Sequence, residues 1–331
     1  MKILSKIQKD LEFDYYNRYQ TGPTEDSFIF ESKPFSYFLL HKHNKTCISL
    51  SINSKITDQV NENDHKHSLV LNMPFFDNYG HCLHDVIPKL LWYDTKSDAD
   101  VIYTNGSELM NSLLNLFEIK FKKIFFLEKD TKLNTDKIAI ENHPAYHTRD
   151  KEKVRLLKNI INKQLHKLCD NQNKKSLIYC TRNTSSDAFH GRKMNEKNEE
   201  EIINLLKKYA KQENLHFVLF NGQEDGKTMS HLKQMQIFSN AKVVVGPHGS
   251  AMANVIYCNP KNNVKICEFS SGTEVQIHGG IFNKHYNFLN GNLLEEIYDY
   301  YLIPFTKGST SEVTDIDIDN LKDFLNIPNL T

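Results

Sequence analysis

Apolar residues recur along the first half of the chain with strand-like and helix-like spacings. Short apolar or alternating runs predict strands at residues 27–30, 35–40, 47–52, 68–76, 101–103 and 122–127. Apolar residues at helical spacing predict helices at residues 82–92 and 109–117. The strand–helix–strand order that follows residue 68 is typical of an α/β fold.

The second half alternates more regularly. A long helix is predicted at 150–169, and the polar run 170–175 ends it. Further strands are predicted at 176–181, 216–220, 242–246 and 264–269, and further helices at 196–211, 230–238 and 250–257. Because these strands are apolar throughout and helices separate them, we expect a parallel sheet covered on both faces, with ligands beyond the strand C-termini.

The amino-acid composition argues against several classes of protein. Among 331 residues, 41 basic side chains balance 41 acidic ones, so no net field draws the chain to nucleic acid or anionic lipid. Six cysteines without a Cys-x-x-Cys pair argue against a zinc site or a disulfide framework. No window approaches the ~18 apolar residues of a membrane span. The first ten residues lack the apolar core of a signal peptide. We therefore expect a soluble, cytoplasmic protein without a transmembrane segment.

The most informative segment is 243–254, VVVGPHGSAMAN. It predicts a buried strand, a small-residue turn and the start of a helix. Backbone N–H groups at such a helix start can bind a phosphate, and Gly246 and Gly249 let the backbone approach a ligand. His248 adds a donor for a diphosphate or a sugar. A tight packing corner without a ligand fits the same pattern.

Charged side chains follow the predicted strands at the same sheet edge. Arg182 comes after the strand 176–181, and Arg192 and Lys193 precede the helix 196–211. Guanidinium groups suit diphosphate oxygens, although ordinary surface charges explain these residues equally well.

Three more polar residues at these element ends have two readings each. Asn195 and Glu196 are candidates for the phosphate site. Alternatively, both serve the start of the helix at 196–211: Asn195 caps it, and Glu196 does the same job through a negative charge that interacts favourably with the helix dipole. Glu268 ends the last strand, where it either accepts hydrogen bonds from ribose or faces solvent.

In the first half, the segment 77–85, DNYGHCLHD, is unusually polar before an apolar helix. His81 and Asp85 are four residues apart and so share one helical face. A carboxylate can orient an imidazole as a general base, which makes the pair a catalytic candidate. A structural histidine at a helix start is the alternative.

Four segments combine these features in one order along residues 70–290. They read NYGHCLHDVIPKL at 78–90, YCTR at 179–182 with RKMNE at 192–196, GPHGSAMAN at 246–254, and KICE at 265–268. Together they resemble the motifs of the family 61 glycosyltransferases. That family includes plant xylan arabinosyl- and xylosyltransferases and animal O-linked N-acetylglucosaminyltransferases. Ser250 stands where the family has Ala, and Gly80 and Cys82 stand where aromatic residues are usual.

The resemblance implies an α/β, GT-B-like fold with two Rossmann-like lobes. The implied division is an acceptor-side lobe at 1–150, a linking helix at 151–175, a nucleotide-sugar-binding lobe with a parallel sheet at 176–290, and a tail at 291–331 that packs back on the lobes. Without the secretory anchor of plant and animal members, a bacterial or viral setting is expected.

The implied activity is an inverting transfer of a hexose or pentose from a nucleotide-sugar, most often a UDP-sugar, to a glycan or glycoprotein hydroxyl. Asp85 with His81 is the predicted catalytic pair. The predicted nucleotide-sugar-binding residues are Arg182, Arg192, Lys193, Asn195, Glu196, Gly246, His248, Gly249, Ser250, Asn254 and Glu268. No metal ligands are predicted, and a divalent metal is not expected to be essential, because Arg, Lys and a helix N-terminus can stabilise the leaving diphosphate.

Two other functions fit the sequence. The first is a carbohydrate- or nucleotide-binding protein on the same fold without transferase activity. The second is a metal-dependent hydrolase whose ligands would come from four histidines, His65, His67, His81 and His84. Nothing in the sequence indicates a nucleic-acid-binding module.

Overall fold

The structure is a computed structural model that describes residues 27–31, 36–41, 46–51, 68–72, 78–97, 100–127, 132–133, 137–142, 151–168, 174–183, 193–270, 274–277, 280–283, 297–307 and 313–327. The chain forms two compact units. Unit 1 comprises Met1–Arg149 with His278–Gly280, and unit 2 comprises Asp150–Ile277 with Ile281–Thr331. Within the described residues, no helix has the length and apolar character needed to cross a membrane.

Unit 1 is built on a five-stranded sheet. Its strands, in spatial order, are β1 (Ser27–Glu31), β8 (Lys137–Asn142), β4 (Ser68–Asn72), β5 (Val101–Asn105) and β6 (Ile124–Leu127). Four of these strands run parallel, and β1 pairs antiparallel with β8. A smaller sheet joins β2 (Ser36–His41), β3 (Thr46–Ser51) and β7 (Lys132–Leu133). The predicted strands of the first half are thus confirmed, and β7 and β8 were not predicted.

The helical run after β4 begins earlier than predicted. It comprises α2 (Tyr79–His81), a π-helical turn η1 (Cys82–Val86) and α3 (Ile87–Lys96). The Asn78 side chain accepts a hydrogen bond from the His81 backbone N–H and caps the start. The predicted helix at 109–117 is α4 (Glu108–Leu116), which Ser107 caps.

Unit 2 contains a six-stranded sheet. Its spatial order is β10 (His216–Phe220), β9 (Ser176–Cys180), β13 (Ala241–Pro247), β14 (Lys265–Ser270), β17 (Asp299–Lys307) and β18 (Asp315–Ile316). The four predicted strands are parallel, as predicted, β17 adds a fifth parallel strand that was not predicted, and β18 is antiparallel to β17. From β9 the chain passes to β10 on one side and then returns to β13 on the other. This reversal creates a topological switch point at the C-terminal ends of β9 and β13.

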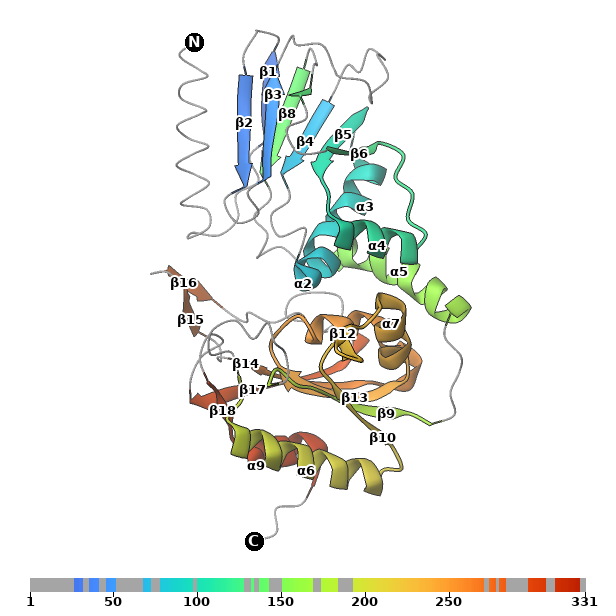
Figure 1. Cartoon of the computed structure of the whole chain (residues 1–331), viewed down its shortest axis with the longest axis vertical. Helices are drawn as coiled ribbons and strands as arrows, with labels where there is room; N and C mark the ends of the chain where they lie inside the picture. The colour runs from blue at the N-terminus through green and yellow to red at the C-terminus, as the bar shows by residue number, and fades with distance from the viewer. Residues whose placement is uncertain are drawn as a thin grey trace. The chain divides into compact units, whose positions relative to one another are not determined.

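Helices cover both faces of this sheet, as predicted. They are α5 (Lys151–Leu168), α6 (Glu196–Gln212), α7 (His231–Ser239), α9 (Ile318–Leu325) and the 3-10 helices η2 (Met252–Tyr257) and η3 (Pro260–Asn262). Figure 1 shows α6 and α9 side by side on one face and α7 on the other. Alternate strand residues serve the two faces. Leu177 and Val245 join the core beneath α6, and the equally buried Ile178 and Val244 point to the opposite face.

Two segments of unit 2 differ from expectation. The predicted helix at 250–257 is a 3-10 helix that begins only at Met252. The C-terminal segment, predicted as a tail, supplies β17 to the sheet and α9 to its covering layer. Short strand pairs, β11 (Gln223–Glu224) with β12 (Lys227–Thr228) and β15 (Glu274–Ile277) with β16 (Gly280–Asn283), complete the described strands.

Candidate functional site

The switch point of unit 2 brings together residues that are 66 positions apart in the sequence. Arg182 follows β9, and His248 follows β13, the neighbouring parallel strand. The Arg182 Nη1 donates a hydrogen bond of 2.6 Å to the His248 carbonyl oxygen. The guanidinium is therefore held against the 246–250 turn, at the sheet edge where α/β proteins bind ligands.

The turn itself presents backbone donors. The N–H groups of Gly249, Ser250 and Ala251 make no hydrogen bond within the part of the chain that the structure describes, whereas the Met252 N–H bonds the Gly249 carbonyl. Successive unpaired N–H groups form an anion-binding concavity. Because η2 is a short 3-10 helix, these local N–H groups, and not a long helix dipole, carry the attraction predicted for an anion.

The two glycines of the turn differ in purpose. A Cβ on Gly246 would lie 2.7 Å from the Cβ and the carbonyl oxygen of Cys180, so this glycine permits the close approach of β13 to β9. A Cβ on Gly249 would lie 3.2 Å from the Arg182 Cζ. Gly246 thus makes room for strand β9, not for a ligand as expected, whereas Gly249 leaves space beside the Arg182 guanidinium.

His248 is held by a buried carboxylate. Its Nδ1 lies 2.7 Å from Glu268 Oε1, and the Tyr300 hydroxyl donates to Glu268 Oε2 at 3.3 Å. Glu268 is fully buried, so the solvent-facing alternative for this residue is wrong. The carboxylate instead fixes the imidazole ring, whose Nε2 is the ring nitrogen farther from Glu268. Tyr300, from β17, had no signal in the sequence.

The remaining predicted residues of unit 2 separate into structural and surface positions. Asn195 caps α6, since its Oδ1 accepts from the N–H groups of residues 197 and 198. Asn254 is buried and its Nδ2 donates to the Ala251 carbonyl, which braces the turn from within. Lys193 and Glu196 are exposed, Glu196 in the first turn of α6. Arg192 lies outside the described residues.

Glu199 belongs to this edge although the sequence analysis left it out. Its Oε1 accepts hydrogen bonds from the Thr181 hydroxyl at 2.7 Å and the Tyr179 hydroxyl at 3.0 Å. Burial raises the pKa of Glu199, and hydrogen bonds from Thr181, Tyr179 and Asn183 act in the opposite direction. The carboxylate thereby anchors the residue that precedes Arg182.

The sequence carried a signal for Glu199. It shares the buried face of α6 with Ile202, Leu206 and Ala210, at positions i, i+3, i+7 and i+11. A carboxylate on an otherwise apolar helix face indicates a buried hydrogen-bond acceptor.

A second support lies behind the turn. Lys158 of α5 is fully buried and donates to the carbonyl oxygens of Ile256 at 2.6 Å and Cys258 at 2.8 Å. The Tyr298 hydroxyl donates to the same Cys258 oxygen at 2.5 Å. Burial lowers the pKa of Lys158 to about 7. These contacts fix the end of η2, the element that follows the turn.

Unit 1 contains the predicted catalytic pair, His81 and Asp85. His81 Nδ1 lies 2.7 Å from Asp85 Oδ2, and both side chains are buried. The predicted contact between residues four apart is confirmed, with the difference that the π-helical turn η1 connects them. π-helical turns inside helices occur frequently at functional sites. A buried imidazole whose Nδ1 contacts a carboxylate is the arrangement of an oriented general base.

No cluster of three or more His, Cys, Asp or Glu side chains with metal-binding geometry occurs in the described ranges. Of the four histidines named for a hydrolase, His65 and His67 lie outside those ranges. Cys180 and Cys267 are fully buried, and burial raises the pKa of both thiols.

Comparison with solved structures finds distant likenesses. One is the E. coli heptosyltransferase WaaC with ADP-2-deoxy-2-fluoro heptose, at 8% identity and a TM-score of 0.45, covering 78% of this chain and 99% of that chain. Another is the iron-containing dodecameric glycosyltransferase TibC from enterotoxigenic E. coli, at 11% identity and a TM-score of 0.37, covering 80% and 84%. Likenesses this distant decide neither substrate nor mechanism.

Comparison with protein families is decisive. No curated protein matches the chain significantly. The profile of the family described as Glycosyltransferase 61 matches residues 79–265, a span that begins at α2 and ends at β14. It therefore includes the His81–Asp85 pair, Arg182 and the 246–250 turn. Because the match covers more than half of the chain, this protein is a glycosyltransferase and belongs to the glycosyltransferase 61 family.

Proposed function

We propose that the protein transfers a sugar from a UDP-sugar to a hydroxyl group of a glycan or glycoprotein, with inversion at the anomeric carbon. The observation that carries this proposal is the convergence, at the switch point of unit 2, of Arg182, the Glu268-bound His248 and the N–H groups of 249–251, which have no hydrogen-bond partner among the described residues. Cationic, N–H and imidazole donors at one strand edge suit a diphosphate and its sugar.

The donor-binding residues stabilise the leaving group. As the bond between the anomeric carbon and the β-phosphate oxygen breaks, negative charge grows on the diphosphate. Arg182 and the turn N–H groups are donors fixed in advance by the sheet, so little reorganisation is needed as that charge develops. A metal ion is not needed for this step in the proposed mechanism, because the cation and the amide dipoles supply the stabilisation.

The His81–Asp85 pair activates the acceptor in this proposal. Asp85 holds Nδ1 of the imidazole, so His81 accepts the proton of the attacking hydroxyl at Nε2. The hydroxyl oxygen forms the new bond to the anomeric carbon as UDP departs, and the proton remains on His81 until solvent removes it. Asp85 stabilises the imidazolium that forms.

The first test is a thermal shift of the purified protein with UDP, GDP, CMP and ADP, each with EDTA and with manganese. A ligand that binds only the folded state raises its melting temperature by mass action. We expect a shift with UDP in EDTA, together with UDP release from a UDP-sugar in a turnover assay. A shift that requires manganese would overturn the metal-independent step. Binding without turnover would favour the non-catalytic alternative, and activity that EDTA abolishes would favour the hydrolase.

A further inference from the structure

A pocket of about 680 Å³ lies at the other end of the unit 2 sheet. It includes Lys242 and Lys265, which lie at the starts of β13 and β14, whereas His248 follows the end of β13 and Glu268 lies in the C-terminal half of β14. Six residues of a strand separate Lys242 from His248, a distance of roughly 20 Å. The pocket is therefore distinct from the switch-point site, and its volume lies within the usual range of small-molecule pockets.

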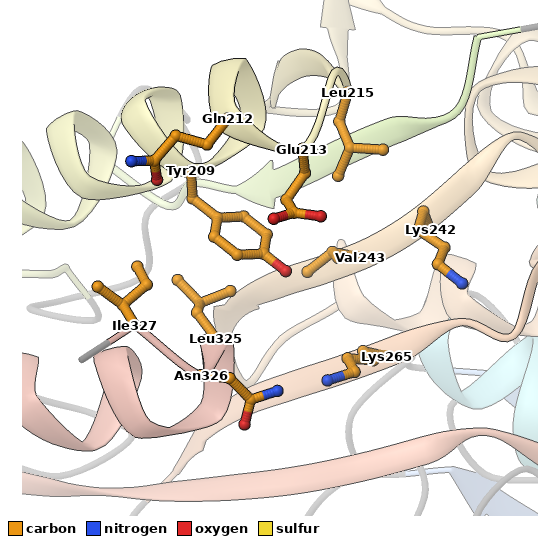
Figure 2. A pocket seen from close by; sticks show the side chains of 10 residues that line it. All are labelled: Tyr209, Gln212, Glu213, Leu215, Lys242, Val243, Lys265, Leu325, Asn326 and Ile327. Atoms are coloured by element: carbon orange, nitrogen blue, oxygen red, sulfur yellow. The ribbon is translucent and has the colours of Figure 1, made fainter.

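The lining combines one aromatic ring, aliphatic side chains and several polar groups. Figure 2 shows Tyr209, Glu213 and Lys265 directed into the same space. The aliphatic members are Leu215, Val243, Leu325 and Ile327, and the other polar members are Gln212, Lys242 and Asn326. An aromatic ring beside amide and carboxylate groups can pack on the apolar face of a sugar while the polar groups bind its hydroxyls.

The charges of the pocket are not paired with one another. Within the described residues, neither ammonium group has a carboxylate within 4.0 Å, and Glu213 has no cationic partner within that distance. The Lys242 ammonium donates to the carbonyl oxygens of Asn262 and Asn263, and the Lys265 ammonium makes no hydrogen bond among those residues. Two cations against one anion leave an excess positive charge, which is available to an anionic ligand.

Two helices end at this pocket, which restricts the kind of anion. α6 ends at Gln212 and α9 at Leu325, and both residues line it. Helix C-termini carry partial negative charge, and this disfavours a polyphosphate such as a second nucleotide. A ligand with one negative charge and many hydroxyl groups fits better, because its hydroxyls can donate to Glu213 and to the amide oxygens.

We propose that this pocket is an accessory subsite that binds a sugar residue bearing a carboxylate, as part of an acidic glycan acceptor. The inference rests on the proposed function, because it assigns the acceptor class of the same enzyme. Lys265 binds the carboxylate, and Tyr209 packs against the ring. A chain held here raises its own effective concentration at the enzyme, so long acidic acceptors gain affinity over short ones.

Calorimetric titration of the full chain at low salt tests the subsite, with hexagalacturonate as the acidic probe and maltohexaose as the neutral probe of equal length. We expect hexagalacturonate to bind about tenfold more tightly than maltohexaose. Lys265→Gln and Tyr209→Ala should each weaken that binding by about tenfold. Lys208→Gln is the matched control, since this exposed lysine lies on α6 but does not line the pocket.

UDP titrated into the same samples separates this inference from the proposed function. Lys265→Gln should keep UDP binding, and Arg182→Ala should lose UDP binding while it keeps hexagalacturonate. Hexagalacturonate binding without UDP binding in the unaltered protein would leave the subsite standing and the donor proposal overturned. The subsite is overturned if hexagalacturonate does not bind at millimolar concentration, or if maltohexaose binds equally well. It is also overturned if UDP competes with hexagalacturonate for the pocket and Lys265→Gln abolishes that competition.

Discussion

Each unit contains one buried imidazole–carboxylate pair, and the two pairs have the same hydrogen-bond length but different structural origins. In both, the histidine Nδ1 lies 2.7 Å from a carboxylate oxygen. His81 and Asp85 are four residues apart within one helical run. His248 and Glu268 are 20 residues apart and meet because β13 and β14 are neighbouring strands.

This difference shows what each pair depends on. The contact within the unit 1 pair follows from local helical geometry, because its two residues are four apart in one helical run. The unit 2 pair requires the strand pairing, the Tyr300 hydroxyl and the Lys158 anchor behind η2. We therefore expect changes in unit 1 to affect the chemical step, and changes in unit 2 to affect nucleotide binding and stability together.

The largest expected effect is a loss of turnover when the His81–Asp85 pair of unit 1 is changed. His81→Gln should lower kcat by about 10²- to 10⁴-fold, the usual contribution of a general base, with UDP affinity unchanged. Asp85→Asn should lower kcat less, because the imidazole remains but loses its orienting charge. Steady-state kinetics with a UDP-sugar and calorimetry with UDP check both statements. His166→Gln, an exposed histidine of α5, is the control. A parallel loss of kcat and UDP affinity would place His81 in donor binding instead.

The second-largest expected effect is a loss of UDP affinity when the His248–Glu268 pair of unit 2 is changed. Glu268→Gln should weaken UDP binding by about tenfold, because His248 loses the charge that fixes its ring. His248→Ala should do the same, and the double variant should be no weaker than the stronger single variant. A coupling of about 1.4 kcal/mol follows in this double-mutant cycle, within the range expected for residues in contact. Additive losses would show that the two side chains act separately.

The two pairs also mark how far the sequence could be interpreted. The contact of His81 with Asp85 follows from helical spacing alone, and it was predicted. Arg182, His248 and Glu268 were predicted as members of one site, because strand C-termini meet at one edge. The contact between His248 and Glu268 was not, because spacing does not give the order of strands in a sheet. Because β14 lies next to β13 in the sheet, Glu268 is buried against His248 and positions its ring.

Contacts between residues far apart in the sequence were harder to predict from the sequence. Lys158 bonds a carbonyl 98 residues away, and a lysine within an amphipathic helix gives no sign of such a partner. Glu199 was not predicted as a site residue, although its position on the apolar face of α6 indicated burial. β17 was missed because Pro304 interrupts its apolar pattern; this proline lies opposite Ser270, the last residue of β14.

The third effect is a pH dependence of stability that arises behind the unit 2 turn. Folding lowers the Lys158 pKa from 10.5 to about 7, because burial disfavours the ammonium. Below that lower value both states are protonated, and the folded state bears the full desolvation cost. Between the two values the unfolded chain binds more protons, so the free energy of unfolding rises with pH, by at most about 1.4 kcal/mol per pH unit.

Urea denaturation across this pH window measures the slope. Lys158→Met should remove this contribution and flatten the profile, whereas Lys163→Met, at an exposed position of α5, should keep it. The neutral amine still has two hydrogens for the Ile256 and Cys258 carbonyls, so the turn should stay anchored above the transition. An unchanged slope in Lys158→Met would assign the pH dependence to other groups.

The smallest effect tests whether the unit 2 turn binds the donor through its backbone. A Cβ at Gly249 would lie 3.2 Å from the Arg182 Cζ, so the flexible guanidinium must shift by a few tenths of an ångström. Gly249→Ala should weaken UDP binding by about fivefold, close to 1 kcal/mol. Ser250→Ala is the matched neighbour. Its exposed side chain is lost while its N–H remains, so UDP affinity should hold. If Ser250→Ala weakened binding more than Gly249→Ala, the hydroxyl would be the donor-binding group and the backbone assignment would fail.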